Sequence, residues 1–212
     1  MKVCYHFTNK DQLESILSEG LKPKCGVNSQ LIADSREERV YYSVGEEATI
    51  NIFTAFDEIL TRALDGRISP ELYETYSDEM KHKLETSNDA ESWMGECVYL
   101  AFDGDTLNDF NEEKPDDANT SDTIPPENLY VCVLKDENSG EIVSTKSSDI
   151  VTYFIAKRTS NYEEVMTIAG FYALDIKDKV EEYRNAHLKV DYIPLSYYYE
   201  LSESENNKRT HL

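Results

Sequence analysis

The chain has 212 residues, 40% of them hydrophobic, which is enough for one domain with a packed core and excludes wholesale disorder. Its 42 acidic residues outnumber 21 basic ones, and the net charge of −21 opposes non-specific binding to nucleic-acid phosphates. Solubility is the simplest role for this acidity, and attraction to a basic protein partner is the alternative.

The four cysteines stand singly, with no C-x-x-C pair and no adjacent histidine, so the sequence predicts no metal site. Three of them (Cys4, Cys97 and Cys132) lie in apolar runs and are expected to be buried thiols, which indicates a reducing compartment. The sequence shows no signal-peptide pattern and no apolar run long enough to span a membrane. We therefore expect a cytoplasmic protein without membrane contact, while secretion without a cleaved signal stays open.

The first elements are the clearest. Residues 2–8 predict a short strand, and Asn9 follows as the expected cap of a helix. Gly20 ends that helix, whose apolar face carries Leu13, Ile16 and Leu17.

The next hundred residues alternate between loop, strand and helix. Residues 22–38 predict a long polar loop, and 39–43 (RVYYS) predict a strand because they are rich in β-branched and aromatic side chains. An apolar periodicity predicts a helix from Glu46, and Ser69 with Pro70 begins a second helix that continues to Leu84.

The second half of the chain is strand-rich. Five short strands are expected, with a sixth following a helix through Val180 and Tyr183. These six are residues 97–102, 129–134, 141–145, 150–156, 164–169 and 188–193. The acid-rich segment 103–127 predicts a surface loop, residues 1–200 a single domain, and the polar residues 201–212 a flexible tail.

Common catalytic motifs, such as G-x-G-x-x-G, the P-loop, G-x-S-x-G and H-E-x-x-H, are absent from the sequence. What remains is a constellation of three residue types: a histidine that ends the first strand, a tyrosine on the second strand, and a glutamate near a late apolar run.

Two segments resemble the ADP-ribosyltransferase superfamily. Residues 5–8 (YHFT), followed by 13–17 (LESIL) and 20–23 (GLKP), are similar to the opening of bacterial ADP-ribosyltransferases and of RNA 2′-phosphotransferases. Residues 40–43 (VYYS), which lead into the helix at Glu46, resemble the second motif of the poly(ADP-ribose) polymerase branch.

The resemblance implies an α+β fold with a split, mixed β-sheet core and packed helices, in which the N-terminal strand lies beside a late strand. It also implies that NAD is bound as a substrate in the cleft. A doubly wound parallel sheet or a helical bundle would be incompatible with it.

The resemblance also implies roles for particular residues. His6 would hydrogen-bond a ribose hydroxyl of NAD, with Phe7 and Thr8 beside it offering backbone groups to the nicotinamide amide. Tyr41 would stack on the nicotinamide ring, since a flat aromatic prefers another π face, and Tyr42 is the alternative. Ser43 would be a further nicotinamide contact.

A glutamate at the start of a late strand completes the family pattern. Such a carboxylate stabilises the positive charge that develops as the nicotinamide–ribose bond breaks. Glu164, directly before an apolar run, is the first candidate for this catalytic role, Glu163 the second and Glu141 the third.

The expected function is transfer of ADP-ribose from NAD to a macromolecular acceptor, a protein or a nucleic acid, with release of nicotinamide. Two alternatives stay open. One is a catalytically degenerate fold that acts as an acidic binding module. The other is an RNA 2′-phosphotransferase-like enzyme, against which the scarcity of basic residues argues.

Overall fold

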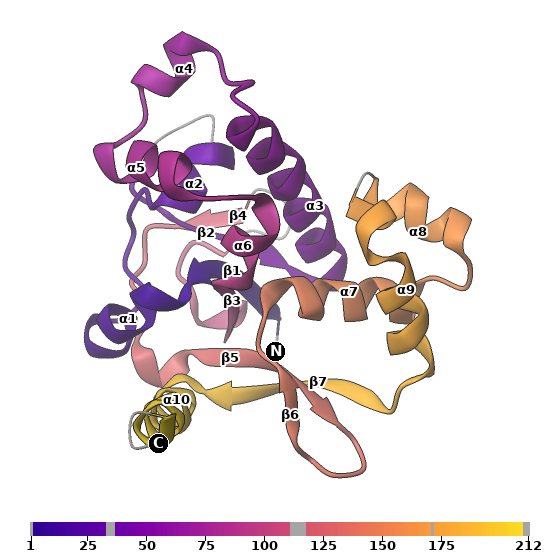
Figure 1. Ribbon diagram of the computed structural model, residues 1–212. Coiled ribbons are helices and arrows are strands. Elements are labelled where there is room, and N and C mark those ends of the chain that lie inside the picture. Colours follow the sequence, from indigo (N-terminus) through magenta and orange to yellow (C-terminus); the bar gives the residue numbers. More distant parts are fainter. Residues whose placement is uncertain (1, 33–36, 111–117, 171, 210–212) are drawn as a thin grey trace.

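The computed structural model of the chain describes residues 2–32, 37–110, 118–170 and 172–209, and confirms the α+β class. Strands form one sheet, and helices cover both of its faces (Figure 1). The strands are β1 (Val3–Asn9), β2 (Val40–Val44), β3 (Cys97–Asp103), β4 (Ala118–Thr120), β5 (Tyr130–Asp136), β6 (Ile142–Ser144) and β7 (Leu188–Pro194). The α-helices are α1 (Leu13–Glu19), α2 (Val27–Ile32), α3 (Gly45–Leu64), α4 (Pro70–Glu74), α5 (Asp78–Thr86), α6 (Ala90–Gly95), α7 (Ser147–Arg158), α8 (Tyr162–Ala169), α9 (Tyr172–Asn185) and α10 (Leu195–Arg209). Three short 3-10 helices are η1 (Lys10–Gln12), η2 (Gly104–Thr106) and η3 (Pro126–Asn128).

The sheet has the strand order β4-β2-β1-β3-β5-β6, and β7 pairs with the other edge of β5. Every pairing among the described strands is antiparallel, so the expectation of a mixed sheet is wrong. The N-terminal strand β1 lies between β2 and β3 rather than beside a late strand.

The joint between β1 and β2 is short. β1 pairs with β3 along all seven of its residues, but with β2 only through Cys4 opposite Val44 and Tyr5 opposite Ser43. Beyond this joint, β2 continues to pair with β4, through Val40 to Tyr42. The pairing between β1 and β2 therefore ends at Tyr5 and Ser43, within a sheet that stays continuous through these two pairs.

Alternate side chains of the central strands enter two separate apolar clusters, because successive residues of a strand point to opposite faces. On β3, Tyr99 joins the cluster beneath α3, α7 and α9, whereas Leu100 joins the cluster on the other face, with α1 and α10. Cys4, Cys97 and Cys132 are buried free thiols, as expected. Among the described residues, no helix has both the length and the apolar character needed to cross a membrane.

Two expected strands are helices. Residues 150–156 belong to α7, which is buried on nearly every side between α3, α9 and the sheet. A fully buried helix shows no amphipathic period, so a short apolar run of this kind resembles a buried strand. Residues 164–169 belong to α8, which begins at the cap residue Asn161 and buries Val165 and Ala169, one turn apart.

Local predictions also need correction in three segments. The loop 22–38 contains α2, and the helix expected from Ser69 to Leu84 is two helices, α4 and α5, with a break between them. The acid-rich segment 103–127 includes the short strand β4. Helix α10 extends into the expected tail as far as Arg209, and residues 210–212 lie outside the described residues.

Asn9 makes no side-chain cap bond. Its carboxamide oxygen instead accepts from the Cys97 thiol at 2.7 Å. The remaining predicted strands and the helix through Val180 and Tyr183 are confirmed, with small shifts of their ends.

Candidate functional site

A pocket opens where β1 and β2 separate. Its walls come from these two strands and from the loop between α1 and α2, and the lining residues are His6, Phe7, Leu21, Lys22, Lys24, Gly26, Val27, Asn28, Ser29, Arg39 and Val40. The cavity measures about 50 Å³, a fraction of the roughly 150 Å³ cavity that holds benzene. It can therefore enclose only part of a nucleotide, and the rest would lie across its mouth.

His6 spans the gap between the two strands. Its Nδ1 lies 2.8 Å from the main-chain oxygen of Tyr41. Because a carbonyl oxygen only accepts, Nδ1 must carry the proton, and in the neutral imidazole Nε2 is then an acceptor. The fold thus holds the ring in one tautomer, in which Nε2 is a hydrogen-bond acceptor.

The surroundings keep His6 neutral. Burial lowers the pKa of His6 below its ordinary value of 6.5, the hydrogen bond to Tyr41 acts in the opposite direction, and the positive charge of Lys24 lowers it further. At neutral pH the imidazole is therefore uncharged and suited to accept from a hydroxyl.

The other residues predicted around His6 divide between pocket and core. Phe7 lines the pocket and packs edge-on against Phe53 and Phe56 of α3, at 6.0 and 5.1 Å between ring centroids. Thr8 is buried and does not line the pocket. Ser43 is also buried, and its hydroxyl lies 2.7 Å from that of Thr49, so it joins β2 to α3.

The two adjacent tyrosines of β2 have different surroundings. The main-chain oxygen of Tyr41 accepts the hydrogen bond from His6. The Tyr41 side chain is half-buried and is not part of the pocket lining. Tyr42 points to the opposite face, where its ring packs against Phe102 and Phe110 in the core. Burial raises the pKa of Tyr42 to about 12. As a core residue, Tyr42 is not placed to stack on a ligand in the pocket.

Three basic residues are among those that line the pocket, and sequence reasoning missed them. Lys22 and Lys24 come from the loop after α1, and Arg39 from the residue before β2. The sequence signal for this basic site is the short segment 22–24, with its two lysines, together with Arg39 directly before the second motif. A search for runs of Lys and Arg does not find this signal, because fourteen residues separate Lys24 from Arg39. The scarcity of basic residues in the whole chain therefore does not argue against a phosphate-bearing ligand.

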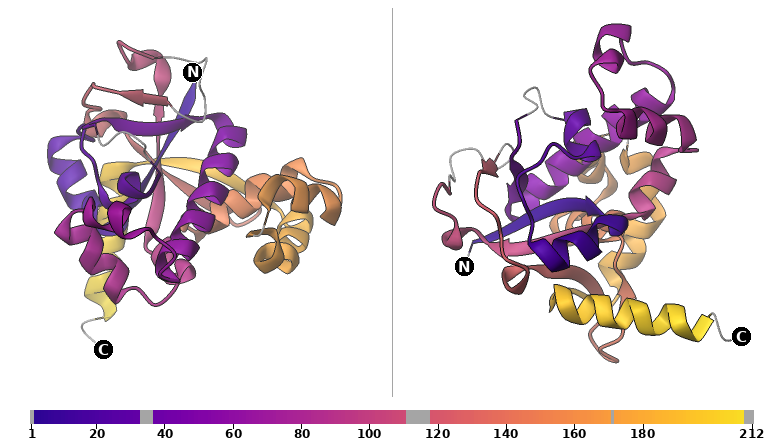
Figure 2. Two further views of the ribbon diagram at one scale, coloured as in Figure 1. Left: turned by 90° about the horizontal axis from the view of Figure 1, so that it is seen from above. Right: turned by 90° about the vertical axis from the view of Figure 1, so that its left-hand side faces the viewer.

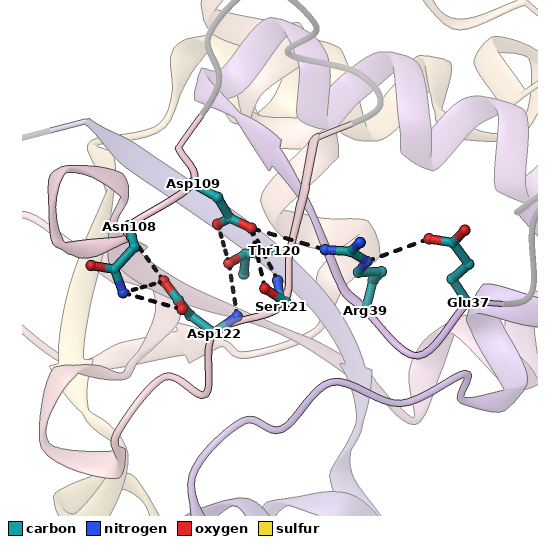
Figure 3. A network of polar contacts seen from close by, with 7 residues as sticks. All are labelled: Glu37, Arg39, Asn108, Asp109, Thr120, Ser121 and Asp122. Carbon is teal, nitrogen blue, oxygen red and sulfur yellow. Dashed lines mark hydrogen bonds and ion pairs between the residues drawn. The ribbon is translucent and has the colours of Figure 1, made fainter.

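Arg39 belongs to a polar network at the rim, between β2 and β4 (Figure 3). Its guanidinium lies 3.4 Å from Glu37 and 4.0 Å from Asp109. The Asp109 carboxylate also accepts from the Thr120 hydroxyl and from the Ser121 amide. Partial burial opposes ionisation of Asp109, but these hydrogen bonds and Arg39 lower its pKa, so the carboxylate stays charged.

The pocket loop is tied down at both ends. Leu21 exchanges two main-chain hydrogen bonds with Ile124, at 2.9 and 3.0 Å. At the other end, the Asn28 carboxamide oxygen accepts from the indole nitrogen of Trp93 at 3.0 Å, and Gln30 bonds the hydroxyl and amide of Ser77. The lysines therefore project from a segment with fixed ends.

The predicted carboxylates lie away from this pocket. Glu163 and Glu164 are in the first turn of α8, on the side of the molecule away from α1 and α2 in Figure 1 and in the left view of Figure 2. Glu164 accepts hydrogen bonds from the amide and hydroxyl of Ser160, at 2.6 and 3.1 Å. Glu141 is in the turn between β5 and β6. The structure thus brings His6 and Tyr41 together but not these three glutamates.

No carboxylate is among the pocket-lining residues that the structure describes, and no group of three metal-ligating side chains occurs in that part of the chain. Searches of the chain against models of protein families, against curated proteins and against solved structures give no match.

Proposed function

We propose that the chain is an NAD-dependent ADP-ribosyltransferase with an ADP-ribosyltransferase-like split sheet, which binds NAD across the pocket at His6. In the reaction, the bond between nicotinamide and ribose breaks, and nicotinamide leaves with the bonding electron pair. A nucleophile of the macromolecular acceptor then bonds to the ribose carbon. The acidic surface favours a basic protein as acceptor or partner.

The observation that carries the proposal is the bridging geometry of His6. Its Nδ1–H donates to the Tyr41 carbonyl at 2.8 Å, which leaves Nε2 to accept from a ribose hydroxyl. We place the sugar where β2 separates from β1 after Tyr5, beside the pocket-lining residue Phe7. The basic side chains nearby suit the diphosphate of a dinucleotide.

A second candidate is a catalytically degenerate fold that binds NAD, or a basic partner, without turnover. It is favoured by one observation, the lack of a carboxylate among the described lining residues. Without such a group near the ribose, the developing positive charge would have no close counter-charge.

The test measures binding and turnover on the same protein. Millimolar NAD should raise the unfolding temperature of the wild type through ligand linkage, and nicotinamide should accumulate when a mixture of basic proteins is offered as acceptor. His6→Ala should remove both effects. The matched control His82→Ala, at an exposed histidine of α5, should keep them.

Three outcomes separate the candidates. Binding with nicotinamide release that depends on His6 supports the transferase. Binding that depends on His6 without release supports the binding module. A wild-type protein with no thermal shift at millimolar NAD contradicts both NAD-based readings.

A further inference from the structure

The three basic residues of the pocket differ in how far their charges are neutralised. Lys22 forms an ion pair with Glu19 at 2.9 Å, and Arg39 lies between Glu37 and Asp109. Lys24 has a different partner, the neutral carboxamide oxygen of Gln12, which accepts from its Nζ at 2.7 Å. Within the described part of the chain, Lys24 is therefore the pocket cation that forms no ion pair, although its charge also helps to lower the pKa of the nearby Glu19 carboxyl.

The positive charge of Lys24 acts on His6, another residue of the pocket lining. Lys24 lines the cavity together with His6, and its positive charge contributes to lowering the pKa of His6. An ammonium group has three N–H donors, and Gln12 takes one of them. Two donors are left for a ligand that enters between the loop and the strands.

We infer that Lys24 binds a phosphate group of the ligand and makes the pocket selective for nucleotides over nucleosides. The inference rests on the proposed nucleotide site at His6. A nucleoside diphosphate carries the two groups that the pocket can recognise, a ribose hydroxyl for Nε2 of His6 and an anionic oxygen for Nζ of Lys24. Hydrogen bonds from an ammonium N–H to a phosphate oxygen are among the stronger ones in proteins, since both groups are charged.

The loop that carries Lys24 is held at both ends, which limits the positions that its ammonium group can take toward a phosphate. Leu21 is bonded to Ile124 and Asn28 to Trp93, so Lys24 occupies the middle of a segment whose backbone is held on both sides. The same link provides a reporter. Trp93 is the only tryptophan of the chain, and its hydrogen-bond partner Asn28 lines the pocket.

The test compares ADP with adenosine, two probes that differ by the diphosphate. Affinities are measured by calorimetry, and Trp93 fluorescence follows the same titrations. Lys24→Gln should weaken ADP binding by about ten- to a hundredfold, the range for a hydrogen bond to a charged group, and leave adenosine binding unchanged. Lys24→Arg, which keeps the charge, should retain most of the affinity for ADP.

Lys157→Gln is the matched control. It removes the same charge from an exposed lysine of α7 that is not among the described pocket-lining residues, so ADP affinity should change by less than about threefold. Equal losses in the Lys157 and Lys24 variants, or a loss that also affects adenosine, would overturn the inference.

This experiment and the test of the proposed function can fail separately. A wild-type protein that binds neither ADP nor adenosine would overturn the assignment of Lys24. Nicotinamide release, measured on the same preparation, tests the transferase reaction separately. ADP binding that depends on Lys24, in a protein that releases no nicotinamide, supports the phosphate contact and contradicts the transferase.

Discussion

His6 shows how one side chain can take a defined chemical form from its surroundings. A histidine is free to adopt either tautomer, but the Tyr41 carbonyl 2.8 Å from the ring of His6 requires a proton on Nδ1. Burial and the nearby Lys24 charge disfavour the doubly protonated ring. Together these contacts make Nε2 an acceptor, which is what recognition of a hydroxyl needs.

The lowered pKa of His6 predicts a pH dependence of stability. Between the ordinary value of 6.5 and the lower pKa of the folded protein, the unfolded chain binds a proton on His6 that the folded protein does not. The free energy of unfolding should therefore fall as the pH decreases from about 6.5 through that lower pKa. Urea unfolding of the wild type and of His6→Gln at pH 7.5, 6.5 and 5.5 measures this. As the pH falls, the free energy of unfolding should decrease more in the wild type than in His6→Gln. Parallel decreases in the two proteins would contradict the prediction.

At the scale of single elements, helix α8 shows that Glu164, the first candidate for the catalytic carboxylate, makes hydrogen bonds at the start of a helix instead. The Asn161 side chain accepts from the Glu164 amide at 3.0 Å, and the Glu164 carboxylate accepts from the Ser160 amide, so both side chains act at the start of the helix. The hydrogen bonds from Ser160 lower the pKa of Glu164. Its contribution to stability is therefore present above its ordinary pKa of 4.5 and is lost as the pH falls through its lower folded pKa.

The capping role predicts that changes at α8 affect stability and not turnover. Asn161→Ala should lower the free energy of unfolding by about 1 kcal/mol, the usual cost of losing an N-cap. Glu164→Gln should destabilise the protein and leave any nicotinamide release unchanged. Glu163→Gln is the control, because its neighbour Glu164 supplies the carboxylate that bonds Ser160. A large loss of turnover in the Glu164 variant, with unchanged stability, would contradict this prediction and indicate a catalytic role for Glu164.

At the scale of the whole molecule, two apolar clusters share the same strands. Tyr99 and Cys132 face one cluster, while their neighbours Leu100 and Val131 face the other. Neither cluster can lose its packing without disturbing β3 and β5, since the same backbone carries both sets of side chains. The two faces should therefore behave as one cooperative unit.

Cooperative unfolding can be tested with the single tryptophan. Trp93 lies in one cluster and Leu100, fully buried, in the other. Leu100→Ala should lower the free energy of unfolding by about 2–5 kcal/mol and shift the Trp93 fluorescence transition as far as the far-UV circular dichroism transition. A fluorescence midpoint that stays in place while the dichroism midpoint moves would indicate two independent units.

Elements with a complete local signal could be predicted from the sequence. The strands β1, β2, β3 and β5 each follow from a run of β-branched and aromatic residues, and the end of α1 follows from Gly20, whose φ of 81° favours glycine. Local sequence also placed His6 on the first strand and Tyr41 on a second one, but His6 lies in the middle of β1 and not at its end. These features depend on residues close together in the chain, so they leave a readable pattern.

Tertiary structure decided the remainder. Residues 150–156 form a helix that α3, α9 and the sheet enclose on nearly every side, and such burial erases the sequence periodicity that separates helix from strand. The basic pocket exists because the short joint of β1 and β2 brings Arg39 to the loop that carries Lys24. The sequence determined which side chains were present in each segment, and long-range packing determined which of them meet, because such contacts depend on how strands pair rather than on neighbouring residues.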